Sequence, residues 1–182
     1  DASSLFTLYL CGDEKAAGKL VSILREKTGA YLDLAEVYLS AGLYEEGMKA
    51  VLLCPAPTVL SNFYLAWAAD RMGDKAACND YIEKGEAGVQ DAVFPNRAFD
   101  FTVLDFISES GRSALAPYYL GCMFYARDNE EPAAACWQLS ALRKPDFADA
   151  HRALAQVMYE HYGDVSAAGV EIEEALRCQR EP

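Results

Sequence analysis

Paired carboxylates are the most frequent residues in this sequence that could support chemistry. They occur at four places, Asp13-Glu14, Glu45-Glu46, Glu130-Glu131 and Glu173-Glu174. Two neighbouring carboxyl groups can act as general acid and general base. The first three pairs come where a helix is expected to begin, however, and negative charge is stabilised there by about 0.3–1 kcal/mol. We therefore expect these acids to cap helices and to keep the surface solvated.

The histidines and cysteines lack the spacing of a metal site. His151 and His161 are ten residues apart in one expected helix, whereas two ligands on one helix face lie one turn apart. The cysteines form no C-x-x-C pair and all lie in apolar helical patterns: Cys11, Cys54, Cys78, Cys122, Cys136 and Cys178. Scattered cysteines of this kind are small core residues of a reducing compartment. We expect no metal, no cofactor and a cytoplasmic location; a cysteine–histidine nucleophile pair is left open but not favoured.

The composition excludes several other classes of function. Hydrophobic residues make up 52% of the 182 residues, enough for a sizeable core, and the formal net charge is -12. That charge repels phosphate backbones and anionic lipids, so nucleic acid and membrane surfaces are not expected partners. No serine-nucleophile, phosphate-loop or dinucleotide motif is present. The chain begins at Asp1 in a helical pattern, without the basic start of a signal peptide, and we expect a fragment of a longer protein.

The elements that position these residues are expected to be helices joined by recurring tight turns. A glycine, aspartate or asparagine ends one helix in a left-handed conformation, and a polar residue caps the next. This pattern occurs at Gly12-Asp13, Gly42-Leu43, Gly73-Asp74, Asp128-Asn129 and Gly163-Asp164. Alternating strand patterns are absent. The sequence therefore predicts an all-α fold of about 11 helices arranged as stacked antiparallel hairpins.

A small residue and then a large one follow each turn at a constant spacing. The small residues are Ala17, Gly47, Cys78, Ala133 and Ala168, and the large ones, four positions later, are Val21, Val51, Ile82, Trp137 and Ile172. Residues four apart share one face of a helix. We expect the small residue to let the two helices of a hairpin approach closely, and the large residue to fill the gap to the next hairpin.

These features resemble the tetratricopeptide repeat (TPR) family. Leu120-Gly121, Phe124, Ala133, Trp137 and Pro145 follow the consensus of its 34-residue unit, and Leu154-Ala155, Met158, Gly163, Ala168, Ile172 and Ala175 follow it again. Shorter or degenerate copies cover Thr28–Cys54, Leu60–Gly85 and Ser3–Lys27. The resemblance implies an α–α superhelix, or solenoid.

One segment departs from the repeats and is expected to divide the array. We predict N-terminal repeats over 1–85, an irregular connection and an extra amphipathic helix over 86–112, and C-terminal repeats over 113–182. The segment V-F-P-N-R, followed by P-Y-Y-L-G, also resembles the repeat section of large bacterial proteins that carry a carbohydrate-enzyme-like β-sandwich domain elsewhere.

The resemblance implies a binding surface on the first helices of the hairpins, where tetratricopeptide arrays hold peptides or partner helices. The positions that correspond to this concave face are Leu32, Glu36, Leu39, Phe63, Trp67, Asp70, Arg71, Tyr118, Cys122, Tyr125, Arg152, Gln156 and Tyr159. Among them, the peptide-binding candidates are Phe63, Trp67, Arg71, Tyr118, Tyr125, Arg152, Gln156 and Tyr159. Their rigid rings suit recognition, but the same rings could instead pack between hairpins. The lysines and asparagines of the family's carboxylate clamp are missing, so that ligand is not expected.

Two functions from different classes remain at this point. The first is a scaffold that binds a protein or peptide partner. The second is a non-catalytic module of a larger, carbohydrate-active bacterial protein, which would position a catalytic domain or mediate self-association. Catalysis within these residues is a third and weaker reading, because no catalytic motif is present.

Overall fold

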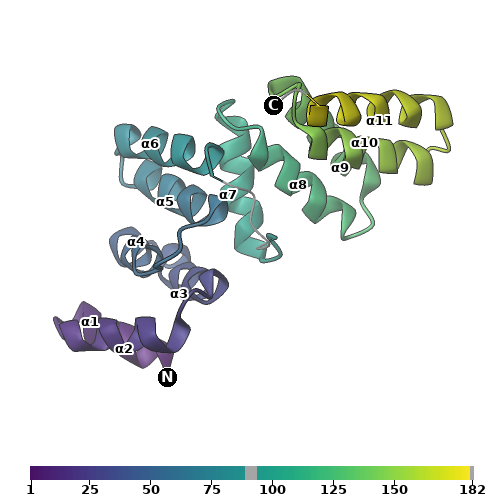
Figure 1. Cartoon of the computed structure of the whole chain (residues 1–182). Coiled ribbons are helices and arrows are strands. Elements are labelled where there is room, and N and C mark those ends of the chain that lie inside the picture. Colours follow the sequence, from purple (N-terminus) through teal and green to yellow (C-terminus); the bar gives the residue numbers. More distant parts are fainter. Residues whose placement is uncertain (89–93, 181–182) are drawn as a thin grey trace. The chain divides into compact units, whose positions relative to one another are not determined.

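The computed structural model describes residues 1–88 and 94–180, and every regular element in that part of the chain is an α-helix (Figure 1). The helices are α1 (Ala2–Leu10), α2 (Glu14–Leu24), α3 (Thr28–Ser40), α4 (Tyr44–Leu52), α5 (Val59–Arg71), α6 (Lys75–Glu86), α7 (Ala98–Glu109), α8 (Leu115–Tyr125), α9 (Glu130–Arg143), α10 (Ala148–Glu160) and α11 (Val165–Arg180). The predicted all-α fold is confirmed.

The helices belong to two compact units, Asp1–Phe94 and Pro95–Pro182. In the first unit, α1 pairs with α2, α3 with α4 and α5 with α6. In the second, α8 pairs with α9 and α10 with α11, while α7 packs against α8. The predicted connection over 86–112 contains α7, and its residues 89–93 lie outside the described part of the chain. Each unit is thus built from antiparallel helix hairpins, as in a tetratricopeptide-like array.

The turn inside every hairpin has the backbone conformation that the sequence predicted. The residue at each turn has a positive φ: 97° at Gly12, 80° at Gly42, 82° at Gly73, 56° at Asp128 and 66° at Gly163. Glycine adopts this left-handed conformation without a steric penalty, and aspartate tolerates it better than most residues. The turn residues therefore fix where each helix ends and its partner begins.

Acidic residues then begin the second helix of each hairpin. The Asp74 carboxylate accepts a hydrogen bond from the backbone N–H of Ala77 at 2.9 Å, and Asp164 accepts one from Ala167 at the same distance. The pairs Glu45-Glu46 and Glu130-Glu131 lie in the first turns of α4 and α9. These carboxylates satisfy or face the free N–H groups of the helix start, so the interpretation of the acid pairs as helix starts is confirmed at these places.

Close approach of the paired helices depends on small residues. A Cβ atom added at Gly47 of α4 would lie 2.5 Å from Leu39 Cγ of α3, so a larger residue there would force the buried Leu39 side chain to move. In α8, a Cβ atom added at Gly121 would lie 2.5 Å from Trp137 Cδ1 of α9. The indole Nε1 of Trp137 donates to the backbone oxygen of Tyr118 at 3.1 Å. Both the contact and the hydrogen bond hold α9 against α8.

Polar side chains join the elements of the second unit. Arg143, in the last turn of α9, donates to the backbone oxygen of Ser113 at 2.8 Å and to that of Ser108 at 2.9 Å. The buried Ser140 hydroxyl donates to the backbone oxygen of Ala114 at 2.8 Å. These bonds tie the C-terminal half of α9 to the end of α7 and the start of α8. None of the helices in the described ranges has the length and apolar character that crossing a bilayer requires.

Candidate binding surface

The predicted binding residues divide between the two units, and those of the first unit lie mainly in its core. The Phe63 side chain is 0% exposed, and a Cβ atom at Gly85 of α6 would lie 2.5 Å from its ring. Trp67 is 6% exposed and meets the ring of Tyr44 edge-on. Arg71 is exposed, with its guanidinium 5.1 Å from the centre of the Trp67 ring. Phe63 and Trp67 therefore pack between helices and offer no exposed surface to a partner.

Tyr118 is also held mainly by packing. Its ring centre lies 5.0 Å from that of Phe147, with the rings edge to face, and burial raises the pKa of its phenol well above the usual value. The side chain is half-buried. Tyr118 thus anchors the segment that leads into α10 to the start of α8.

A polar cluster joins α8 to α10 on the surface of the second unit. The Tyr125 hydroxyl donates to Glu160 Oε2 at 2.5 Å, and Gln156 Nε2 donates to the same oxygen at 3.0 Å. Gln156 Nε2 also lies 3.3 Å from the Tyr125 hydroxyl oxygen. The bonds from Tyr125 and Gln156 lower the pKa of Glu160, while the bond to Glu160 raises the pKa of Tyr125. We call these three residues the Tyr125 cluster; it presents an ionised carboxylate at the surface.

Sequence reasoning missed Glu160, although a signal for it exists. Glu160 lies four residues after Gln156 on the same helix, and side chains at this spacing are neighbours on a helix surface. The positions that correspond to the concave face include Tyr125 and Gln156 but not Glu160.

An open apolar groove lies beside this cluster, between α10 and α11. Its volume is about 430 Å³, and its lining residues are Arg152, Ala155, Gln156, Tyr159, Val165, Ala168, Gly169 and Ile172. Tyr159 is 63% exposed and Val165 67% exposed. Arg152 forms an ion pair with Asp149 one turn earlier. We call this feature the α10–α11 groove. It brings together three predicted residues, Arg152, Gln156 and Tyr159, with residues of the second helix that the sequence reasoning did not consider.

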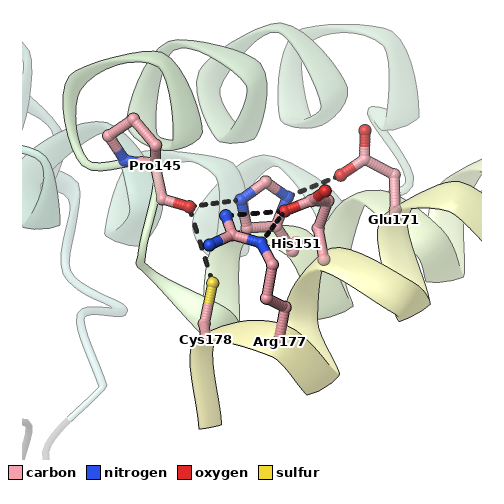
Figure 2. A network of polar contacts seen from close by, with 6 residues as sticks. Pro145, His151, Glu171, Arg177 and Cys178 are labelled. Atoms are coloured by element: carbon pink, nitrogen blue, oxygen red, sulfur yellow. Dashed lines mark hydrogen bonds and ion pairs between the residues drawn. The ribbon is translucent and has the colours of Figure 1, made fainter. Parts of the chain in front are cut away.

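A second polar cluster ties α10 to α11 and to the preceding loop (Figure 2). His151 Nδ1 lies 2.7 Å from Glu171 Oε2, and His151 Nε2 lies 3.0 Å from the backbone oxygen of Pro145. Cys178 Sγ lies 3.5 Å from the same Pro145 oxygen. A carbonyl oxygen can only accept, so Nε2 donates to it and holds its proton there. Nε2 is therefore engaged with the backbone and does not serve as a base toward Cys178.

Two cysteines of the second unit, Cys122 and Cys136, are not activated as nucleophiles. Burial raises the pKa of the Cys136 thiol to about 11 and also raises that of Cys122. Both thiols stay protonated near neutral pH, and the thiolate is the reactive form. In residues 1–88 and 94–180, no three histidine, cysteine or acidic side chains come together as metal ligands.

Comparisons with known proteins give structural similarity without sequence similarity. No family model matches the chain, and no curated protein matches it. A structure of MamA superimposes with a TM-score of 0.43 at 16% identity, covering 92% of this chain and 86% of that one. YrrB, a TPR protein with an unusual peptide-binding site, gives 0.40 at 13% identity, covering 92% and 76%. A chain of the APC/C hetero-tetramer Cut9-Hcn1 gives 0.41 at 16% identity, covering 100% of this chain and 40% of that one.

The chain is thus similar to solved structures that include a tetratricopeptide repeat protein. At these TM-scores the similarity adds no argument about function, and the description of the fold rests on the hairpins, turns and helix contacts given above. None of the comparisons supports the resemblance to carbohydrate-enzyme proteins.

Proposed function

We propose that this protein is a non-catalytic scaffold that binds a protein or peptide partner on the second unit, at the Tyr125 cluster and the α10–α11 groove. The observation that carries this proposal is the exposure of large apolar side chains around a groove that adjoins an ordered polar cluster. Tyr159 and Val165 are each more than 60% exposed on its walls. Large exposed apolar patches with a polar rim are typical of interaction sites.

The chemistry of the surface supports recognition rather than catalysis. Tyr159 supplies a rigid amphipathic ring, and Gln156 supplies an amide that is already oriented by Glu160. Such aromatic and amide groups give contact area and hydrogen bonds at a small cost in side-chain entropy. The imidazole of His151, by contrast, is bonded through both ring nitrogens.

A display library of random 16-residue peptides, selected on the immobilised protein, tests this function. We expect the selected peptides to bind at least tenfold more weakly to a Gln156→Ala, Tyr159→Ala double variant, because both residues line the groove. Fluorescence anisotropy with each labelled peptide measures the change.

Leu142→Ala is the matched control, since Leu142 is an apolar side chain of the same unit that is 77% exposed on α9 and does not line the groove. It should leave the affinities unchanged. The proposed function would be contradicted if the selected peptides bound the double variant as tightly as the unchanged protein, or if the selection yielded no binder.

A further inference from the structure

The α10–α11 groove has a counterpart in the same unit that is already filled by a helix. Leu154 and Val157 of α10 form one buried cluster with Ala133, Ala134 and Trp137 of α9. Leu154 and Val157 are three residues apart and therefore project from one side of α10. Within this chain, the hairpin of α8 and α9 thus receives a helix that presents large apolar side chains at positions i and i+3.

The repeat register maps one groove onto the other. Leu154 follows Leu120 by 34 residues, and Ala168 follows Ala133 by 35, because the last hairpin has one additional residue before Gly163. At this register Ala168, Gly169 and Ile172 of α11 hold the positions of Ala133, Ala134 and Trp137.

The two sets of positions differ in exposure at two of the three places: Ala168 is 7% exposed, whereas Gly169 and Ile172 are open to solvent. Ala133, Ala134 and Trp137 are 0%, 4% and 2% exposed, whereas Ile172 is 44% exposed. The α10–α11 groove therefore has small and large residues at the same positions as the preceding hairpin, but its large side chain, Ile172, is open to solvent.

The floor of the α10–α11 groove has room for side chains from outside. It includes Ala155, Ala168 and Gly169, which carry a methyl group or no side chain. A Cβ atom added at Gly169 meets no atom within 4 Å. A helix with large apolar residues can therefore approach this floor as α10 approaches Ala133 and Ala134.

A second copy of the chain is a poor occupant through its own first helix. In a hairpin without the additional residue, the position of Leu154 lies eight residues before the turn residue, as Leu34 lies before Gly42. Ser4 lies eight residues before Gly12 and therefore holds this position in the first hairpin. Thr7 holds the position of Val157 in the same way. Both side chains are exposed and polar. Helix α1 thus lacks the two apolar groups that fill the counterpart groove.

The charge around the groove also argues against a second copy. Glu160 is exposed and bonded to the groove residue Gln156, and Glu173, next to Ile172, is exposed as well. The lining residue Arg152 forms an ion pair with Asp149. The whole chain carries a formal net charge of -12. Like charges repel at an interface, whereas lysine and arginine beside the apolar stripe of a partner would be attracted.

We infer that the α10–α11 groove binds an amphipathic helix of a partner protein, with large apolar residues at i and i+3 against Ala168, Gly169 and Ile172 and with basic residues on its flanks. This inference rests on the proposed function and names the class of partner. A partner helix of this kind packs against the α10–α11 hairpin in the same way as α10 packs against the α8–α9 hairpin.

The sequence of α10 supplies the probe for a direct test. A fluorescein-labelled peptide of residues 146–161, with Asp149→Lys and Glu160→Lys to give it basic flanks, is titrated with the full chain and followed by anisotropy. A second peptide also carries Leu154→Ser and Val157→Thr, the residues that α1 has at these positions. We expect the second peptide to bind at least tenfold more weakly.

Two matched glycine variants locate the site. Gly169→Leu places a side chain in the groove and should weaken binding of the first peptide at least tenfold. Gly18→Leu makes the same change in helix α2, where an added Cβ atom likewise meets nothing within 4 Å, and should have no effect. Circular dichroism of both variants checks that the helices are retained.

Several outcomes would overturn the inference. Equal binding of the two peptides, or binding that Gly169→Leu leaves intact, places the helix elsewhere. If analytical ultracentrifugation detects a dimer of the chain, and the Gly169→Leu variant is monomeric, the groove is occupied by a second copy. If the helical probe fails while display-selected peptides still depend on Gln156 and Tyr159, this inference fails and the proposed function stands. If both kinds of peptide fail, both proposals fail.

Discussion

Two neighbours on different helices lower the pKa of Glu160. The carboxylate accepts hydrogen bonds from Tyr125 of α8 and Gln156 of α10, and both bonds favour its charged form. Hydrogen bonds to a carboxylate lower its pKa, since protonation would give them up. At the residue scale, the Tyr125 cluster is therefore a proton-linked contact between two hairpins.

Tyr125→Phe tests this linkage. Removal of the hydroxyl takes away the larger of the two interactions that lower the Glu160 pKa, so that pKa should rise. Because the folded-state pKa of Glu160 is depressed, its contribution to stability is present above the unfolded pKa and is lost as the pH falls through the folded one. NMR titration of the Glu160 carboxyl carbon measures the shift. Tyr159→Phe removes a hydroxyl from the adjacent residue and should leave the titration unchanged; an unmoved titration in Tyr125→Phe contradicts the assignment.

Helix pairing depends on a few glycines. The sequence shows that these residues are small but not whether a close contact requires them. Gly121 faces the indole of Trp137, which is also fixed by its hydrogen bond to Tyr118. The ring is rigid and 2% exposed, so it cannot move aside without disturbing the cluster around it. At the scale of elements, α8 and α9 are held at one separation by this contact. Gly169 of α11, one hairpin later, faces open space.

Alanine at these two glycines should have opposite effects on stability. Gly121→Ala should lower the free energy of unfolding by about 1–3 kcal/mol, because the added methyl group overpacks a filled core. Gly169→Ala should raise it by about 1 kcal/mol, because alanine has the higher helix propensity and nothing obstructs it. Urea denaturation followed by circular dichroism measures both. A neutral Gly121→Ala would mean that α9 shifts easily against α8, contrary to the packing described here.

At the scale of the whole molecule, we expect the acidic net charge to favour a basic partner. The chain carries a formal net charge of -12, and its long-range attraction to a basic helix should fall as salt screens it. The Debye length is about 10 Å at 0.1 M salt and about 3 Å at 1 M. The apolar contacts in the groove do not share this dependence.

Salt should therefore weaken binding of the basic α10 probe without abolishing it. We expect the affinity to fall several-fold as sodium chloride is raised between these concentrations. The affinity of the same peptide with its native Asp149 and Glu160 should not fall, because that peptide is acidic and salt screens its repulsion from the acidic chain. Anisotropy titrations at several salt concentrations provide the measurement. Affinity that rises with salt for both peptides would show that apolar burial alone drives the association.

Most of the fold could be predicted because its signals are local. The turn residues, the acids at helix starts and the small residue after each turn act through the backbone of a few neighbouring positions. A left-handed residue such as Gly42 ends a helix in almost any context. The hairpins and their register follow from such positions, and the structure has them where the sequence indicated.

The binding residues could be predicted less well, because exposure depends on distant neighbours. Phe63 and Tyr159 look alike in the sequence, as aromatic residues on the first helix of a hairpin. Phe63 is 0% exposed because Gly85 of α6 lets that helix pack against its ring, whereas Tyr159 is 63% exposed beside Gly169 and Val165. The order of elements was therefore determined by the sequence alone. Only the tertiary structure decided which aromatic side chains meet solvent, since burial is set by how residues of other helices pack against each ring.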